Sequence, residues 1–69
     1  MDVKKVVKMV DEYGEVMIRT ASGTTFELHK HNVEYDKKTG MLKIQGGTEI
    51  YWIAAENIDY FWIHKKAID

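Results

Sequence analysis

Hydrophobic and polar residues alternate along most of this chain, in short runs that are separated by turn-forming residues. The runs are rich in Val, Ile, Thr and aromatic residues, which favour β-strands, and their period of two predicts strands with one face in a core. The predicted strands cover residues 16–20, 24–28, 33–35, 41–45, 48–53 and 58–64. This pattern predicts an all-β domain, either a small barrel or a strongly bent antiparallel sheet of five or six strands.

The turns between these runs carry recognisable signals. Ser22-Gly23 separates the first two predicted strands. Residues 36–40 suit a type I turn, in which Asp36 accepts backbone N–H bonds and Gly40 takes the left-handed conformation. Gly46-Gly47 suits a two-residue hairpin that needs positive φ at both central residues. These signals predict three hairpins.

The inward-facing positions change parity between the second and third predicted strands. Phe26 and Leu28 are even-numbered, whereas Val33 and Tyr35 are odd-numbered, and one flat strand cannot turn all four inward. Either a bulge or sharp bend lies within residues 29–32, or these are two separate strands. The other residues that we expect to face inward are Val16, Ile18, Leu42 and Ile44.

The N-terminal segment allows two interpretations. Val3, Val6, Val7 and Val10 are spaced as one stripe of a helix, which Asp2 could cap and Gly14 could end. Four valines are nevertheless poor helix formers, because β-branching restricts their χ1 angles in a helix. The alternative is a strand followed by a turn at residues 11–14. The valine content tips the prediction slightly towards the strand, and a short N-terminal helix stays the alternative.

The last third of the chain is apolar on both faces of its predicted strands and holds five of the eight aromatic residues. In a regular final strand Ile58, Tyr60 and Trp62 share one face, and Phe61 and Ile63 share the other. One face can fill a core, and the other needs cover, either from a second copy of the chain or from the N-terminal valines. The predicted interface residues are Ile50, Tyr51, Trp52, Tyr60, Phe61, Trp62 and Ile63.

Two pairings are open for the final strand. If Ile53 faces Ile58, then Tyr51 faces Tyr60, and cross-strand pairs of this kind stabilise a sheet. If residues 54–57 instead form a short helical turn, the final strand joins a different neighbour.

Composition and charge narrow the possible functions. The 69 residues suit one domain, and the absence of cysteine excludes disulfides and cysteine-based zinc sites, so stability must come from a dense core or from self-association. The net charge of −1 argues against nucleic-acid binding by bulk electrostatics. Neither a signal peptide nor a stretch long enough to span a membrane is visible, so a cytoplasmic protein without membrane contact is expected.

The predicted order of elements is an optional helix, a strand, a long bent strand, two short strands, a brief turn and a final strand. This order resembles that of the Sm-like and SH3-like small β-barrels. The resemblance rests on residues 16–20, Ser22-Gly23, residues 26–35, 36–40, 41–45 and 53–63. It implies a barrel and, for the Sm-like proteins, a nucleic-acid-binding ring.

The RNA-binding signatures of the Sm-like family are missing from this chain. Sm-like proteins carry an Asp-x-apolar-Asn element after the bent strand, whereas Asp36 is followed here by Lys37, Lys38 and Thr39. They also carry Arg-Gly or Lys-Gly before the last strand, where this chain has Glu56-Asn57. The candidate nucleic-acid-binding residues are Lys37, Lys38 and Lys43, and exposed aromatic residues could stack on bases.

Metal binding and catalysis are two further functions that the residue types allow. His29 and His31 lie two apart in a predicted strand, and Glu27, with His64 or Asp36 brought in by folding, could join them around a metal ion. A pair of solvent-facing histidines explains the pattern more simply, so no metal or cofactor is predicted. A catalytic motif is not recognisable either, since the chain has no cysteine and its one serine, Ser22, lies in a predicted turn.

These observations predict a non-enzymatic binding or assembly module. It would use its aromatic-rich C-terminal surface to contact a second copy of itself, as a homo-oligomer, or a protein partner. The alternative is an Sm-like nucleic-acid-binding oligomer.

Overall fold

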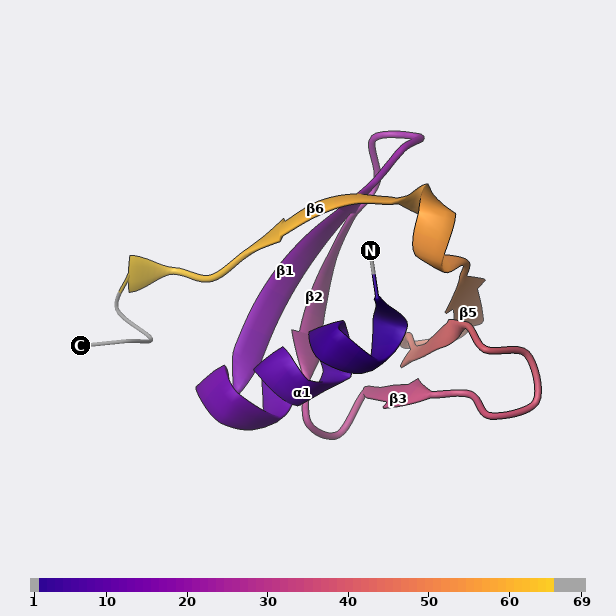
Figure 1. The fold of residues 1–69 in the computed structure, drawn as a ribbon, viewed down its shortest axis with the longest axis horizontal. Helices are drawn as coiled ribbons and strands as arrows, with labels where there is room; N and C mark the ends of the chain where they lie inside the picture. Colours follow the sequence, from indigo (N-terminus) through magenta and orange to yellow (C-terminus); the bar gives the residue numbers. More distant parts are fainter. Residues whose placement is uncertain (1, 66–69) are drawn as a thin grey trace.

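The computed structural model describes residues 2–65 and consists mostly of β-strands with one N-terminal helix (Figure 1). Its elements are α1 (Val3–Tyr13), β1 (Glu15–Thr20), β2 (Thr25–His29), β3 (Val33–Tyr35), β4 (Leu42–Gln45), β5 (Ile50–Ile53), a 3₁₀ helix (Ala55–Asn57) and β6 (Ile58–Trp62). The first sheet has the strand order β2-β1-β6 and the second sheet has the order β3-β4-β5, with every pairing antiparallel. Six antiparallel strands are thus confirmed, but within residues 2–65 the two sheets do not close into a barrel.

The N-terminal segment is a helix, so the preference for a strand was wrong. The Asp2 side chain caps it by accepting the Lys4 N–H at 3.0 Å, and Gly14 ends it with a left-handed φ of 81°. Val3, Val6 and Val10 are buried. Burying a complete helical stripe of valines outweighs their weak helix propensity, since most helical stability in proteins comes from packing an apolar face.

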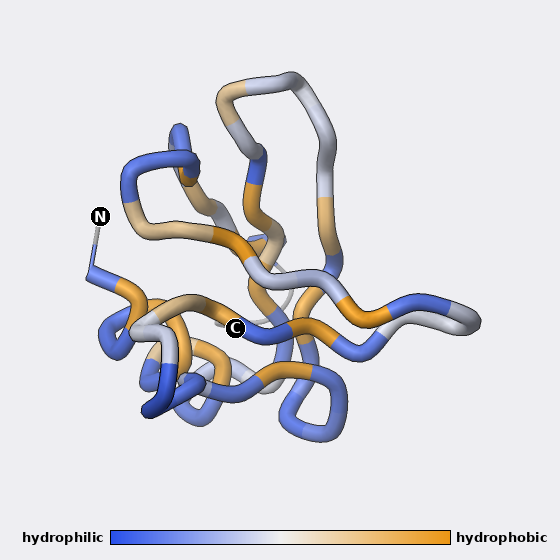
Figure 2. Tube along the Cα trace, turned by 90° about the vertical axis from the view of Figure 1, so that its right-hand side faces the viewer, coloured by the Kyte–Doolittle hydropathy of each residue, from blue (hydrophilic) through white to orange (hydrophobic). Residues whose placement is uncertain are grey.

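The helix joins the two sheets. It packs on β1 of the first sheet and on β3 of the second (Figure 1). The buried core therefore draws on the helix and on both sheets, and consists of Val3, Val6, Val10, Val16, Ile18, Leu28, Leu42, Ile44 and Ile58. Hydrophilic positions gather at several of the outer turns (Figure 2).

The parity of the inward-facing residues changes after Leu28 because β2 and β3 are two separate strands. This was one of the two alternatives that the sequence left open. The Asn32 side chain accepts the His29 N–H at 2.6 Å and donates to the carbonyl oxygen of Glu27 at 3.0 Å. These bonds turn the chain out of β2 and into β3, which belongs to the other sheet. The inward faces predicted from the sequence are confirmed: Val16, Ile18, Leu28, Leu42 and Ile44 are buried, and Phe26, Val33 and Tyr35 pack against them.

Two of the three predicted turns are confirmed, and the predicted geometry of the third is wrong. Gly23 and Gly40 have positive φ angles of 94° and 73°, as their turns require, and Asp36 accepts the Lys38 N–H at 2.9 Å. The two-residue hairpin at Gly46-Gly47 was wrong. Gln45 pairs with Ile50, so four residues connect these strands, and neither glycine has a positive φ.

Gly46 is needed for close packing. Its N–H donates to the Glu49 carbonyl oxygen at 2.7 Å, and a Cβ atom on Gly46 would lie 2.8 Å from that oxygen and 3.0 Å from Cε2 of Tyr51. The position therefore has no room for a side chain.

We expect Gly46→Ala to lower the free energy of unfolding by about 1–3 kcal/mol, because backbone must move to admit the methyl group. Gly47→Ala is the matched control, since a Cβ atom there meets nothing within 4 Å. It should be neutral or stabilising by about 0.4–1 kcal/mol, through the reduced entropy of the unfolded chain. Urea denaturation measures both, and equal effects at the two glycines would contradict this explanation.

The final strand pairs with β1 and not with β5. The expected facing of Ile53 and Ile58 was therefore wrong, and the alternative of a helical turn that redirects the chain is confirmed. Asn57 fastens this turn to the first sheet, because its carbonyl oxygen accepts the Ala21 N–H at 2.8 Å. No helix within residues 2–65 has the length and apolar character that crossing a membrane requires.

Candidate interaction surfaces

A β-bulge in β6 decides which aromatic side chains face outward. Thr20 pairs with Ile58, but Arg19 pairs with Tyr60, so Asp59 is an extra residue without a partner on β1. The bulge places Ile58 inside, only 5% exposed, although Tyr60 is 47% exposed. The expectation that Ile58, Tyr60 and Trp62 share one face was thus wrong for Ile58.

Beyond the bulge, Phe61 and Ile63 pack against the core, where Phe61 faces Ile18 across the strands. The N-terminal helix contributes its buried valines to this same core. The helix, which was one of the two expected covers for the second apolar face of this strand, packs mainly on β1 and β3. The outward side of β6 does not face this core and forms a separate surface.

That outward surface, which we call the β6 patch, consists of Met17, Tyr60 and Trp62. The rings of Tyr60 and Trp62 lie 5.4 Å apart between centroids, and Met17 is the cross-strand partner of Trp62. Arg19 lies opposite Tyr60 and is exposed. The β6 patch is therefore a strip of apolar surface with a charged residue at one end.

A second apolar surface, the β5 patch, consists of Ile50 and Trp52 on the outer face of the second sheet. Both side chains are 46% exposed, whereas Tyr51 and Ile53 on the other face pack against the core. The Trp52 indole N–H donates to the Asp36 carboxylate at 2.7 Å, and Lys43 Nζ lies over the ring, 5.6 Å from its centroid. Trp52 is thus held in place while one side of its ring system remains open to solvent.

The seven predicted interface residues are consequently divided. Four face outward on two different sheets, namely Ile50, Trp52, Tyr60 and Trp62, and three face inward, namely Tyr51, Phe61 and Ile63. Alternation along the chain does not reveal the bulge that separates Ile58 from Tyr60, because a charged residue such as Asp59 is also typical of the outward face of a regular strand.

Hydrogen bonds lower the pKa of the Asp36 carboxyl from its ordinary value of 3.8. The larger cause is the backbone N–H of Lys38, and the indole N–H of Trp52 adds to it. Both donors favour the charged carboxylate.

Because its pKa is lowered in the folded protein, the Asp36 carboxylate contributes stability above its unfolded pKa, and this contribution is lost as the pH falls through the folded pKa. We expect the NMR signal of the Trp52 indole proton to titrate with a midpoint below 3.8. Asp36→Asn should abolish this titration. A midpoint at or above the ordinary value would contradict the hydrogen-bonded arrangement.

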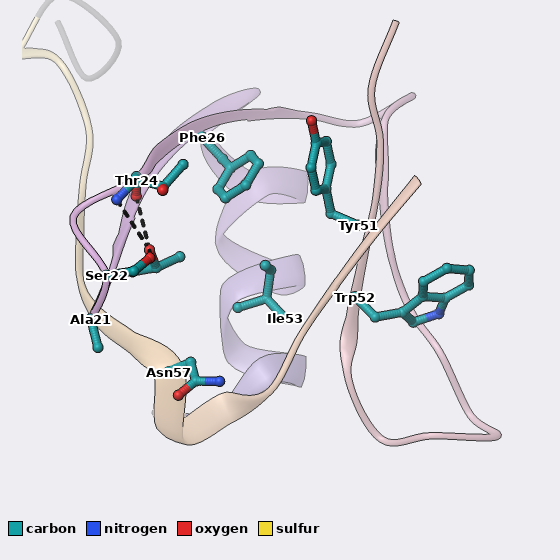
Figure 3. A pocket seen from close by; sticks show the side chains of 9 residues that line it. Ala21, Ser22, Thr24, Phe26, Tyr51, Trp52, Ile53 and Asn57 are labelled. Atoms are coloured by element: carbon teal, nitrogen blue, oxygen red, sulfur yellow. Dashed lines mark hydrogen bonds between the residues drawn. The ribbon is translucent and has the colours of Figure 1, made fainter. Parts of the chain in front are cut away.

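An open concavity of about 600 Å³ lies between the β1–β2 hairpin and β5 (Figure 3). Its lining residues are Thr20, Ala21, Ser22, Thr24, Phe26, Tyr51, Trp52, Ile53 and Asn57. The rings of Phe26 and Tyr51 meet edge to face at 5.0 Å. The hydroxyls of Thr20 and Ser22 lie 2.8 Å apart and bond to each other, so these polar groups serve the hairpin.

The charge of Glu49 raises the pKa of the Tyr51 hydroxyl, which also donates a hydrogen bond to that carboxylate at 3.2 Å. The Tyr51 hydroxyl is therefore a hydrogen-bond donor to the protein itself. The concavity offers mainly apolar contact.

The three predicted nucleic-acid lysines come together around a second concavity. Lys37, Lys38 and Lys43 line it beside Trp52. Two carboxylates lie among them: Asp36 also lines the concavity, and Glu34 Oε1 is 3.7 Å from Lys43 Nζ. The positive charge that the lysines bring is partly neutralised.

The two candidate histidines are separated. β2 ends at His29, and His31 lies in the following turn, beside Lys30 and Asn32. His29 instead has Glu27 and Glu15 as neighbours, and its Nε2 atom is 3.4 Å from Glu27 Oε2. The candidate pair of His29 and His31 on one strand face is therefore not formed.

Comparison of the chain with protein-family models, with curated proteins and with solved structures gives no match.

Proposed function

We propose that this protein is a non-enzymatic assembly module whose copies associate through the edge strands β5 and β6. Within the described residues each of these strands has a hydrogen-bonded neighbour on one side only. Natural edge strands are usually protected by lysine, proline or inward-pointing charges. β5 has no charged residue, β6 has only Asp59, and the chain has no proline. These two apolar edges, of which β6 carries only Asp59 and its bulge as protection, are the observation that carries the proposal.

Pairing β5 of one copy with β6 of the next uses both edges in a single kind of contact. Such a head-to-tail contact produces a closed ring when the rotation between copies closes. Strand pairing would also bring the β5 patch beside the β6 patch of the neighbour and remove apolar area from water. A domain of 69 residues without cysteine gains stability from this burial.

The order of elements supports the same proposal. A helix precedes the strands, the chain bends between β2 and β3, and a 3₁₀ helix precedes β6, which is the order on which the resemblance to Sm-like and SH3-like small barrels rests. By this resemblance we also propose a barrel-like arrangement of the two sheets in the assembled protein. A cytoplasmic location is a separate proposal.

Variants at the two edges test the head-to-tail contact. Ile50→Lys places a charge on the β5 edge and Tyr60→Lys places one on the β6 edge, at side chains that are 46% and 47% exposed. In sedimentation, each variant alone should be a folded monomer. An equimolar mixture should form a dimer, since the intact β6 edge of the first variant meets the intact β5 edge of the second.

Lys5→Glu on the exposed side of the helix is the control and should keep the mass of the unaltered protein. Two results would contradict the proposal. If both variants retain the full mass, the association does not use these edges. If Ile50→Lys alone stops at a dimer, like edges pair with each other and the contact is not head to tail.

Nucleic-acid binding is the second candidate, and one observation favours it: Lys37, Lys38 and Lys43 gather beside the exposed Trp52. We propose single-stranded nucleic acid as the ligand of this surface, with Trp52 stacking on a base. If three phosphates are neutralised, the affinity for an oligonucleotide should fall about 20-fold between 50 and 200 mM salt. Fluorescence anisotropy measures this, and an affinity that does not depend on salt would exclude it.

A further inference from the structure

We propose that the outer face of the first sheet binds one zinc ion, through Glu15, Glu27 and His29, with His64 as the fourth ligand. The observation behind the proposal is that Glu15, Glu27 and His29 bring their ligand atoms together at one end of β1, and that His64 approaches Glu15 from the other side of this strand. This site is independent of the assembly contact, which uses the edges of β5 and β6.

Strand pairing places the first three ligands together. Glu15 of β1 is the direct cross-strand partner of His29, and Glu27 lies two residues before His29 on the same face of β2. Their ligand atoms all lie within 4.8 Å of one another, and His29 Nε2 is 3.4 Å from Glu27 Oε2. Zinc bonds of about 2.0–2.1 Å in a tetrahedron require ligand atoms roughly 3.4 Å apart. The three groups thus need only small side-chain rotations to surround an ion.

His64 adds a second, separate indication. It follows β6, which borders β1 on the side opposite β2, and its Nε2 atom lies 3.7 Å from Glu15 Oε1. Glu15 therefore has an imidazole on each side, one from β2 and one from the segment after β6. Two imidazoles and two carboxylates form a nitrogen and oxygen ligand set that suits zinc, whereas Mg²⁺ and Ca²⁺ prefer oxygen ligands alone.

Charge and access also fit a cation. Glu15 and Glu27 bring two negative charges within 4.8 Å of each other on one face, and like charges so placed on neighbouring strands repel. A divalent cation between them removes this repulsion. The Glu15 side chain is 34% exposed and that of His64 is 59% exposed, so an ion can enter from solvent and the side chains can adjust around it.

The consequence is a metal clamp on a chain that has no disulfide. Zinc would tie together the end of β2, the start of β1 and the segment after β6. Because an ion that binds only the folded chain stabilises it by mass action, zinc should raise the melting temperature.

The test is a calorimetric titration of the full chain with zinc chloride, together with thermal melting. We expect one ion per chain and, at ten times the dissociation constant, a melting temperature higher by roughly 5–10 °C. Magnesium chloride should give no comparable rise. A melting temperature that zinc leaves unchanged, or a heat of binding without a defined stoichiometry, would overturn the proposal.

Variants then identify the ligands. His29→Ala and Glu27→Gln should each weaken zinc binding at least tenfold, and His64→Ala should weaken it several-fold. His31→Ala is the matched control, since it removes an exposed histidine two residues away that lies in the turn. Zinc binding that depends on His31 as strongly as on His29 would place the ion elsewhere and overturn the site proposed here.

Discussion

Phe61→Glu is expected to unfold this protein, whereas the same substitution at the next residue, Trp62, is expected to leave it folded. Phe61 faces the fully buried Ile18 across β1 and β6 and packs against the core. A glutamate there loses the apolar contacts of a large aromatic ring, worth about 3–5 kcal/mol, and also places a charge at a partly buried position against the core. A loss of this size is comparable to the whole stability of a small domain.

Trp62 lies on the opposite face, in the β6 patch, where a glutamate stays in contact with water. Its expected effect is on association, since the charge disrupts the apolar edge that meets the next copy. Far-UV circular dichroism and solution mass separate the two results. If both variants unfold, the outward side of β6 is part of the core. If Phe61→Glu remains as stable as the unaltered protein, the bulge does not set the parity of this strand.

The second large effect is expected at the helix. Val6 is fully buried in the core, and Val6→Asp would place a carboxylate among apolar side chains. Since burying a charge without a partner costs several kcal/mol, we expect the variant to lose cooperative folding at 25 °C.

Lys5→Asp is the matched control, because it introduces the same side chain one residue earlier on the exposed side of α1. Its effect should stay within about 0.5 kcal/mol, helped by the favourable interaction of a negative charge with the helix N-terminus. Urea denaturation followed by circular dichroism compares the two. A Val6→Asp variant that unfolds with the same midpoint as Lys5→Asp would mean that the helix is not part of the core.

Much of the fold followed from local patterns. Alternation identified the inward faces of β1, β2 and β4, and the parity change correctly required either a bend within residues 29–32 or two separate strands. The Asp36–Gly40 turn was predictable because its hydrogen bonds and its left-handed glycine are local. These features depend on residues that are close in sequence.

The features that could not be predicted from the sequence depend on contacts between residues that are distant in the chain. The helix over Val3–Tyr13 forms because its valine stripe is buried by β1 and β3, which the weak helix propensity of valine conceals. Gly46 is required by the approach of Glu49 and Tyr51 and not by its own φ angle. The bulge at Asp59 is defined by how β6 pairs with β1, so the sequence of β6 alone does not reveal it.

In the candidate sites too, the contacts that could not be predicted are those between residues distant in the chain. Glu27 and His64 were possible partners for His29 from the sequence, but Glu15 was not, because it reaches His29 only through the β1–β2 register. His31 was the nearest histidine in sequence and lies in the turn instead. Likewise the run of apolar residues in β5 and β6 indicated an interaction surface, while the division into inward and outward residues needed the register of both sheets.

The solution mass of the unaltered protein, measured by light scattering over a wide range of protein concentration, tests self-association through β5 and β6 most directly. We expect a mass of several chains of 8.1 kDa each, which dissociates only on dilution. A mass of 8.1 kDa at every concentration would show that the two apolar edges do not join copies of this chain.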